Sequence, residues 1–394
     1  MKQPLYFHWG ISMLYGWGVY GLNLLRHWPG VSGSPAYCIG KIHLESLGGM
    51  DPLALRVLAQ PLVDSDQMRL RVNPDENAGQ KLDGVLLQSL GNFMSGGHKP
   101  SDGGVSGTAT AAAIFFEDSN LPNAAEIAKD YRVIVAGSTW CEEVLRANGV
   151  EHTRTVVQGT DPSLFHPAPR AGWLDGRFAV FSGGKIEVRK GQDIVLLAFR
   201  AFAERHPEAI LVTAWHSPWP IAAVTVNANP RIAPIGFTPD GAADIKSWVA
   251  ANGIAEHQFI DLGPIPNHAM AKVLREMDVA LFPNRCEGGT NLVAMECMAC
   301  GLPTIVSNNT GHRDLVATGG AFALNRQGPL AIPGKGTDGW GESDIDEIVA
   351  MLDAVWADRE NAKAVGLRAA AAMHEWNWRN QINKLHGVLA AYCE

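Results

Sequence analysis

The chain has 394 residues, more than a single hydrophobic core usually serves, so we expect two domains. Its 46% hydrophobic and 18% charged residues are those of an ordinary globular protein, which excludes a disordered, collagen-like or coiled-coil chain. The net charge of −8 argues against a nucleic-acid partner, which demands a basic surface. No apolar run reaches the length of a membrane-spanning helix and the N-terminus lacks the form of a secretion signal, so we expect a cytoplasmic enzyme or binding protein.

Short apolar runs in the first half of the chain predict strands that alternate with helices. The predicted strands are residues 5–9, 84–89, 112–116, 132–136 and 155–157. One helix start is well marked, because Thr139 and Glu142 have the spacing of a capping box. This helix should end near Asn148 and Gly149.

A connection between domains is predicted at residues 161–176, which carry three prolines and two glycines. We therefore expect an N-terminal, acceptor-side domain at residues 1–168 and a second, donor-binding domain at residues 169–372. The last segment, residues 373–394, has a helical pattern, and we expect it to cross back to the first domain.

The second half of the chain has the more regular pattern, with short β-rich runs between amphipathic stretches. The predicted strands are residues 178–182, 210–214, 258–262, 279–283 and 304–307. One predicted helix has an apolar face from Ile194 to Phe202, and another runs from Asn291 to Cys300 and stops at Gly301. This alternation predicts an α/β fold with parallel sheets. Residues 29–80 and 217–256 show no clear period.

The six cysteines are scattered, which favours reduced thiols over a disulfide framework. Cys297 and Cys300 have the spacing of a redox pair or half a zinc site, but no second pair completes four ligands, so we interpret them as buried residues of a helix. No metal site is expected. Asp64 and Asp66 form a D-x-D sequence, the motif of a metal-dependent GT-A transferase, and a metal site at these two residues remains a minor alternative.

Two segments follow predicted strands of the second half, at the sheet edge where such folds bind ligands. Residues 183–191 combine glycines with Lys185 and Lys190 before a helix, which suits a diphosphate. The order of a P-loop is absent, and solvated lysines on an exposed loop are the alternative. In the other segment, Glu287 precedes a helix and Glu296 lies inside it, where each carboxylate can accept hydrogen bonds from neighbouring hydroxyls of a sugar or ribose.

A family resemblance rests on these same segments. Residues 283–303 resemble the E-x7-E region of retaining GT-B glycosyltransferases, especially the bacterial family 4 enzymes, or glycosyl transferases group 1. Residues 183–191 resemble the family's G-R-L-x-x-x-K-G element, and residues 159–167 resemble its interdomain link. The resemblance is specific from about residue 131 to 316 and implies an α/β GT-B fold, with two Rossmann-like domains facing a central cleft.

The resemblance also implies a role for each matching residue. Lys185 and Lys190 would hold the diphosphate of the donor and Glu296 its ribose, while Glu287 would face the transferred sugar. The start of the helix would line the donor site with Gly288, Gly289, Thr290, Asn291 and Leu292. By the same analogy, Gly16 and Gly18 would belong to a glycine-rich loop that borders the donor, with an ordinary tight turn as the alternative.

Three departures from the family pattern affect these roles. Eight residues separate Glu287 from Glu296, where the family has seven. Lys185 stands in place of an arginine and cannot form a bidentate contact. Many members carry a histidine near the anomeric carbon, where this chain has Glu117 and Asp118, so we expect an acidic catalytic group there.

The implied function is transfer of a sugar, with retention at the anomeric carbon, from a UDP- or GDP-sugar to an acceptor hydroxyl, without a metal or other cofactor. The acceptor could be a glycan, a lipid-linked molecule or a protein, and peripheral attachment to the inner face of a membrane also stays open. Two alternatives remain, namely a nucleotide-sugar epimerase of the same architecture and a non-catalytic protein that binds sugar nucleotides.

Overall fold

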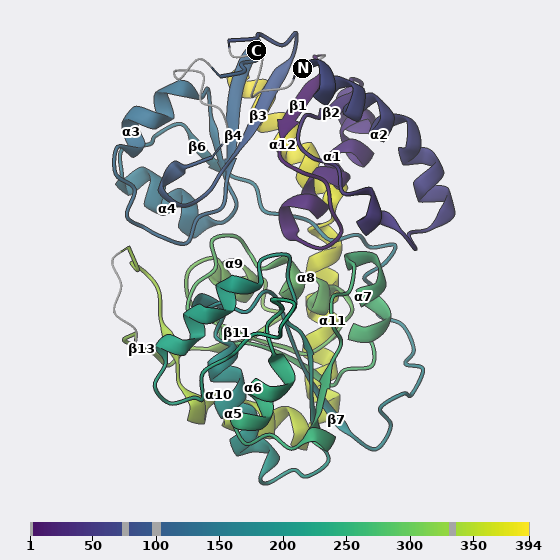
Figure 1. Cartoon of the computed structure of the whole chain (residues 1–394), viewed down its shortest axis with the longest axis vertical. Coiled ribbons are helices and arrows are strands. Elements are labelled where there is room, and N and C mark those ends of the chain that lie inside the picture. The colour runs from purple at the N-terminus through teal and green to yellow at the C-terminus, as the bar shows by residue number, and fades with distance from the viewer. Residues whose placement is uncertain (1–2, 73–78, 97–103, 331–335, 394) are drawn as a thin grey trace.

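The computed structural model describes residues 3–72, 79–96, 104–330 and 336–393. Within these residues two six-stranded sheets form the centres of two α/β domains, and Figure 1 shows the first domain above the second. Every neighbouring pair of strands in both sheets is parallel. Parallel strands need crossover connections, and helices supply most of them.

The first sheet has the strand order β2-β1-β3-β4-β5-β6. Its strands are β1 (Leu5–His8), β2 (Ala36–Cys38), β3 (Val85–Leu90), β4 (Ala109–Ile114), β5 (Ile134–Ala136) and β6 (Thr153–Thr155). The helices of this domain are α1 (Gly16–Ser32), α2 (Pro52–Val72), α3 (Ala124–Ile127) and α4 (Thr139–Ala147). The central strand β4 is fully buried and β3 is buried except at Ser89, as expected for a sheet covered on both faces.

The second sheet has the order β12-β11-β10-β7-β8-β9. Its strands are β7 (Phe178–Gly183), β8 (Ala209–Ala214), β9 (Phe259–Asp261), β10 (Val279–Phe282), β11 (Thr304–Ser307) and β12 (Phe322–Leu324). Its helices are α5 (Gln192–Ala203), α6 (Ile245–Ala251), α7 (Asn267–Leu274), α8 (Leu292–Ala299), α9 (His312–Val316), α10 (Ile345–Ala357) and α11 (Arg359–Glu375). A small antiparallel pair, β13 (Gln327–Gly328) and β14 (Glu342–Ser343), lies beside it.

The C-terminal helix α12 (Trp378–Cys393) lies against α1 of the first domain, as the yellow helix in Figure 1 shows. The Trp378 ring stacks on Tyr20 with centroids 5.4 Å apart. The chain between the two helices pairs with the interdomain link, because Trp378 N donates to Thr160 O over 3.0 Å. The crossing helix begins at Trp378, so the expected boundary at residue 373 falls inside the last turn of α11.

Three local features differ from the sequence expectations. The cap of α4 is Ser138, whose Oγ accepts a hydrogen bond from Cys141 N over 3.2 Å. The sequence predicts Thr139 as the cap, but Thr139 is the first residue of the helix. Gly16 and Gly18 lie in the first turn of α1 and not in a loop. Residues 29–80, for which the sequence predicts no element, contain the long helix α2, and Pro61 interrupts the helical pattern of its sequence.

Candidate functional site

The two segments expected to bind the donor lie side by side at the carboxyl ends of β7 and β10, which pair in the second sheet. The main-chain N–H of Arg285 donates to Arg189 O over 2.7 Å and joins the two loops. Gly191 has φ +71°, and a Cβ there would lie 2.4 Å from Pro283 O. Only glycine permits this close approach, so the contact between the loops depends on it.

A cluster of charged side chains fills the space where these loops meet. Lys190 Nζ forms an ion pair with Glu287, and Lys185 Nζ lies 3.0 Å from Glu187 Oε2. Arg189 lies between the acids, with Nε 2.9 Å from Glu187 Oε2 and Nη1 3.5 Å from Glu287 Oε2. We call Lys185, Glu187, Arg189, Lys190, Glu287 and Glu117 the charge cluster.

Glu117 completes the charge cluster from the other domain. It follows β4, and its Oε1 lies 3.1 Å from Arg189 Nη2. The Arg189 side chain retains 11% of its exposure and the Glu117 side chain 23%, so this ion pair is largely shielded from water. The structure therefore joins an expected catalytic acid of the first domain to the donor loops of the second.

The acids and bases of the charge cluster stabilise each other's charged forms. Burial opposes the charge of Glu287, but Lys190 and Arg189 outweigh it and lower the pKa of this carboxyl. Burial also opposes the charge of Arg189, yet the carboxylates of Glu117, Glu187 and Glu287 raise its pKa. For Lys190, burial prevails over the attraction of Glu287 and lowers the pKa. Glu287 is thus ionised at neutral pH.

The turn before α8 brings main-chain amides to the domain boundary. A Cβ on Gly288 would lie 2.2 Å from Phe116 O, and one on Gly289 would lie 2.9 Å from Phe115 Cδ1, so both glycines allow the domains to approach. Asn291 caps α8 with φ +62°, and Leu292 packs against the core of the first domain. Thr290 is buried, with Oγ1 2.9 Å from Met295 Sδ.

Glu296 is buried inside α8 with 3% of its surface exposed. Its carboxylate accepts a hydrogen bond from the side-chain amide of Asn267, the first residue of α7. Burial raises the pKa of Glu296 to about 8 against this hydrogen bond, which acts in the opposite direction. Asn267 also donates its main-chain N–H to Met13 O of the first domain over 2.8 Å.

This raised pKa gives a pH-dependent stability. Because the native state binds the proton more tightly than the unfolded chain, the contribution of Glu296 is complete below its ordinary pKa of 4.5 and is lost as the pH rises toward about 8. We expect Glu296→Gln to gain stability relative to the unmodified protein over this interval, by up to about 1.4 kcal/mol per pH unit. Urea unfolding at several pH values measures this difference. The exposed Glu204→Gln is the control, and parallel stability curves for Glu296→Gln and the unmodified protein would contradict the prediction.

The remaining expected residues lie near the domain boundary with other contacts. Asp118 Oδ1 accepts from Asn120 N over 2.8 Å, so it closes a local turn. A Cβ on Gly18 would lie 2.5 Å from Ser12 N, which explains a glycine there by close packing of the preceding loop. Gly16 O accepts from Gln158 Nε2 over 3.4 Å. These contacts do not join Gly16 or Gly18 to the charge cluster.

Three buried side chains of this region were not predicted from the sequence. Arg189 precedes Lys190 in the same basic segment, but nothing in the sequence indicated that it would pair with acids of both domains. Arg285 is buried and makes a bidentate ion pair with Asp193, at 2.7 and 2.8 Å. His312 is buried between Asn291 and Ser307, and burial lowers its pKa to about 4, so it is neutral.

The other sequence hypotheses concern metals and membranes. Asp64 and Asp66 lie on α2, where Asp64 accepts from Gln60 and Asp66 pairs with Arg69, and not at a strand end. Among the described residues no group of three acids, histidines or cysteines could hold a metal ion. Cys297 and Cys300 are buried on α8. In the same part of the chain, every helix is too short or too polar to span a bilayer.

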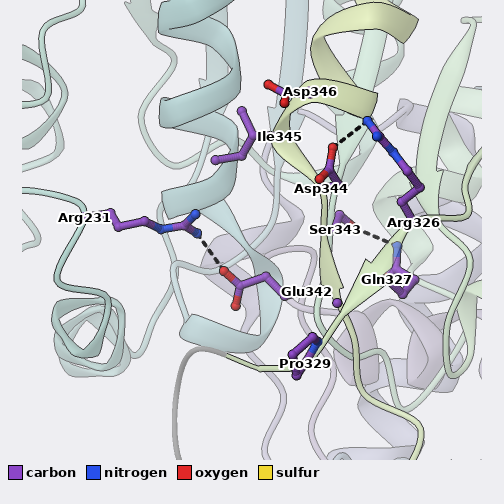
Figure 2. Close-up of a pocket in the computed structure, with 10 residues that line it drawn as sticks. Arg231, Arg326, Gln327, Pro329, Glu342, Ser343, Asp344, Ile345 and Asp346 are labelled. Carbon is purple, nitrogen blue, oxygen red and sulfur yellow. Dashed lines mark hydrogen bonds and ion pairs between the residues drawn. The ribbon is translucent and has the colours of Figure 1, made fainter.

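A hollow of about 680 Å³ lies outside the charge cluster, beside β13 and β14 (Figure 2). Most of its polar side chains are paired with one another. Arg231 Nη2 lies 2.6 Å from Glu342 Oε1, and Arg326 Nη2 lies 2.6 Å from Asp344 Oδ1. Gln327 Nε2 donates a hydrogen bond to Ser343 Oγ over 2.9 Å. None of the residues expected to bind the donor lines it, so we place the candidate site at the charge cluster.

Comparison with known proteins finds a matching family and several similar proteins. Residues 169–327 match the family described as Glycosyl transferases group 1. A GDP-mannose-dependent alpha-(1-6)-phosphatidylinositol dimannoside mannosyltransferase of Mycobacterium tuberculosis is 28% identical over 52% of this chain and 49% of its own. A D-inositol 3-phosphate glycosyltransferase of Nocardia farcinica is 24% identical over 68% of this chain and 53% of its own. The chain thus spans about half the length of the curated relatives it matches.

Solved structures match the chain over nearly its full length. The sucrose-phosphate synthase of Thermosynechococcus elongatus superposes with a TM-score of 0.64 at 14% identity, over 99% of both chains. Anabaena HepE in complex with UDP superposes with a TM-score of 0.60 at 14% identity, over 99% of this chain and 100% of HepE. At such low identity these matches establish the fold alone. The chain has the GT-B fold, and its residues 169–327 are similar to the glycosyl transferases group 1 family.

Proposed function

We propose that the protein is a retaining glycosyltransferase that moves a sugar from a nucleotide-diphosphate sugar to an acceptor hydroxyl, without a metal or other cofactor. The observation that carries this proposal is the charge cluster, where Arg189 and Lys190 pair with Glu287 and Lys185 pairs with Glu187 at the carboxyl ends of β7 and β10. These cations and the N-terminus of α8, which follows Glu287, would together bind a diphosphate. The family match of residues 169–327 supports the same reaction class.

The three cations and three carboxylates of the charge cluster balance one another when no donor is bound. A donor diphosphate would replace the carboxylates as partners of the lysines. As the bond to the sugar breaks, negative charge grows on the leaving diphosphate, and Lys185 and Lys190 would stabilise it more strongly than in the ground state. The ionised Glu287, freed from Lys190, would face the oxocarbenium-like sugar and stabilise its positive charge.

The ribose of the donor would bind at Glu296. Glu296 is the fifth residue of α8, which follows the turn at residues 288–291. A diphosphate at the turn and a ribose at Glu296 would therefore follow one another as they do in a nucleotide. Two neighbouring hydroxyls would replace Asn267 as partners of this carboxyl and favour its ionised form. A UDP- or GDP-sugar is the proposed donor, because a relative is named GDP-mannose-dependent and a neighbour was solved with UDP.

A donor panel tests this proposal. Thermal unfolding with GDP, UDP, GDP-mannose and UDP-glucose should show a rise in midpoint with one nucleotide series, because a ligand that binds only the native state stabilises it. The same donor should then release its nucleotide diphosphate on incubation with the protein, equally well in EDTA. Transfer that needs added Mn²⁺ would contradict metal independence. Conversion of the donor to an isomeric sugar nucleotide, without release, would favour an epimerase.

A further inference from the structure

A short segment of the second domain crosses to the first domain and holds the residues beside Glu117. Residues 336–341, which we call the strap, precede β14. Ser119 N donates to Gly336 O over 2.7 Å, and Ser119 Oγ donates to Asp338 Oδ2 over 2.9 Å while accepting from Asp338 N over 3.0 Å. Trp340 Nε1 donates to Glu117 O over 2.9 Å. Four hydrogen bonds from one segment therefore end on Glu117 and Ser119.

The strap fits closely against the first domain. Gly336 has φ +73°, and a Cβ there would lie 1.6 Å from Asp118 Oδ1. Gly339 has φ +83°, and a Cβ there would lie 2.8 Å from the indole nitrogen of Trp140. The Trp340 ring packs against the buried cluster around Phe116. Such close approaches by two glycines in the left-handed region indicate a contact shaped for this partner surface.

The other end of the strap is tied to the donor side of the charge cluster. Gly341 N donates to Arg285 O over 3.1 Å, and Arg285 lies two residues before Glu287. Glu117 is thereby held in two ways, by Arg189 on its carboxylate and by Trp340 on its main-chain carbonyl. Its own domain contributes Asn92, whose Oδ1 accepts from Glu117 N over 2.7 Å. With both its N–H and its C=O bonded, the backbone of Glu117 is fixed.

We propose that the strap is a positioning element, in which Asp338 and Trp340 fix the Glu117 segment opposite Glu287 when the two domains are together. This inference rests on the proposed function and names what sets the geometry of its site across the domain boundary. All four hydrogen bonds cross that boundary, so they form only when the domains approach. The strap makes none of its contacts with Lys185, Lys190 or Glu296, so the binding of a free nucleotide does not depend on it.

The test compares turnover with nucleotide affinity. Trp340→Phe keeps the ring and removes the indole donor, and we expect the kcat for release of nucleotide diphosphate from the active donor to fall about 10- to 100-fold. The Kd for free GDP or UDP, whichever binds, should change less than about twofold. The matched control is Trp356→Phe, which removes an indole hydrogen bond to Glu208 inside the second domain and should keep normal turnover.

A double-mutant cycle isolates the contact across the boundary. Ser119→Ala and Asp338→Ala should each lower kcat, because both remove the hydrogen bond from Ser119 Oγ to Asp338 Oδ2, and Ser119→Ala also removes the one that Asp338 N donates. The double variant should therefore lose little more than Ser119→Ala alone. Asp338→Asn, which keeps an acceptor oxygen, should recover most of the activity. Normal turnover in Trp340→Phe, additive losses in the cycle, or nucleotide affinity that falls in step with kcat would each overturn the strap's role. A wild-type protein that releases nucleotide diphosphate from no donor would instead overturn the proposed function.

Discussion

Replacing Lys190 with alanine is expected to lower kcat for the active donor by about a hundredfold or more. The lysine forms an ion pair with the buried Glu287 in the loop that we propose binds the donor, so its removal would take away the proposed charge-assisted contact to the diphosphate. Because the charge on the leaving group grows in the transition state, kcat should fall and not only the affinity for the donor. Steady-state kinetics of nucleotide diphosphate release measure both parameters.

Two further variants make this result interpretable. Lys246→Ala removes an exposed lysine from α6 of the same domain and should leave kcat and KM unchanged. Lys190→Arg keeps a cation beside the buried Glu287 and should retain more of the activity than Lys190→Ala, which shows how much of the loss comes from the charge itself. Wild-type kinetics in Lys190→Ala would place the diphosphate away from the charge cluster.

The two segments that meet in the charge cluster could be located from the sequence because the patterns that mark them are local. Lys185 and Lys190 lie within one glycine-rich segment, and Glu287 and Glu296 flank one helix start. The rule that ligands bind beyond the carboxyl ends of parallel strands then brings the two segments together. The structure adds that β7 and β10 are neighbours in the sheet, which no pattern within either segment reveals.

The groups that join the two domains could not be predicted, because their partners are far apart in the chain. Ser119 and Asp338 are 219 residues apart, and Arg189 meets Glu117 across the domain boundary. A lone arginine or aspartate in a polar segment has the same appearance whether it faces solvent or a partner domain. Long-range burial, and not local spacing, decides its role.

Two errors in local structure have local physical causes. The alanine-rich strand β4 begins at Ala109, three residues before the predicted start, since alanine gives little β signal although a buried central strand accepts it. The glycine run from Gly16 was expected in a loop, because glycine disfavours helix interiors. Here Gly18 and Gly21 let α1 pack closely on Ser12 and Phe7, so tertiary packing overrides the propensity.

Breaking the buried ion pair between Arg285 and Asp193 should destabilise the protein more than breaking any other charged pair of the second domain. Its side chains are 1% and 0% exposed, and the pair joins the loop after β10 to the start of α5. Arg285→Met should reduce the free energy of unfolding by about 3–5 kcal/mol, because it leaves the Asp193 carboxylate buried with Asn229 as its one side-chain partner among the described residues.

The test is urea unfolding of single and double variants. Arg285→Met/Asp193→Leu removes both charges and should recover much of the loss, since well-packed apolar residues avoid the desolvation of an unpaired ion. The exposed pair Arg205–Asp353, at 2.8 Å, supplies the control, and Arg205→Met should cost less than about 1 kcal/mol. A loss in Arg285→Met no larger than in this control would mean that the buried pair does not hold α5 against the donor loop. In that case the register of Lys190 against Glu287 would have to depend on the close approach at Gly191 alone.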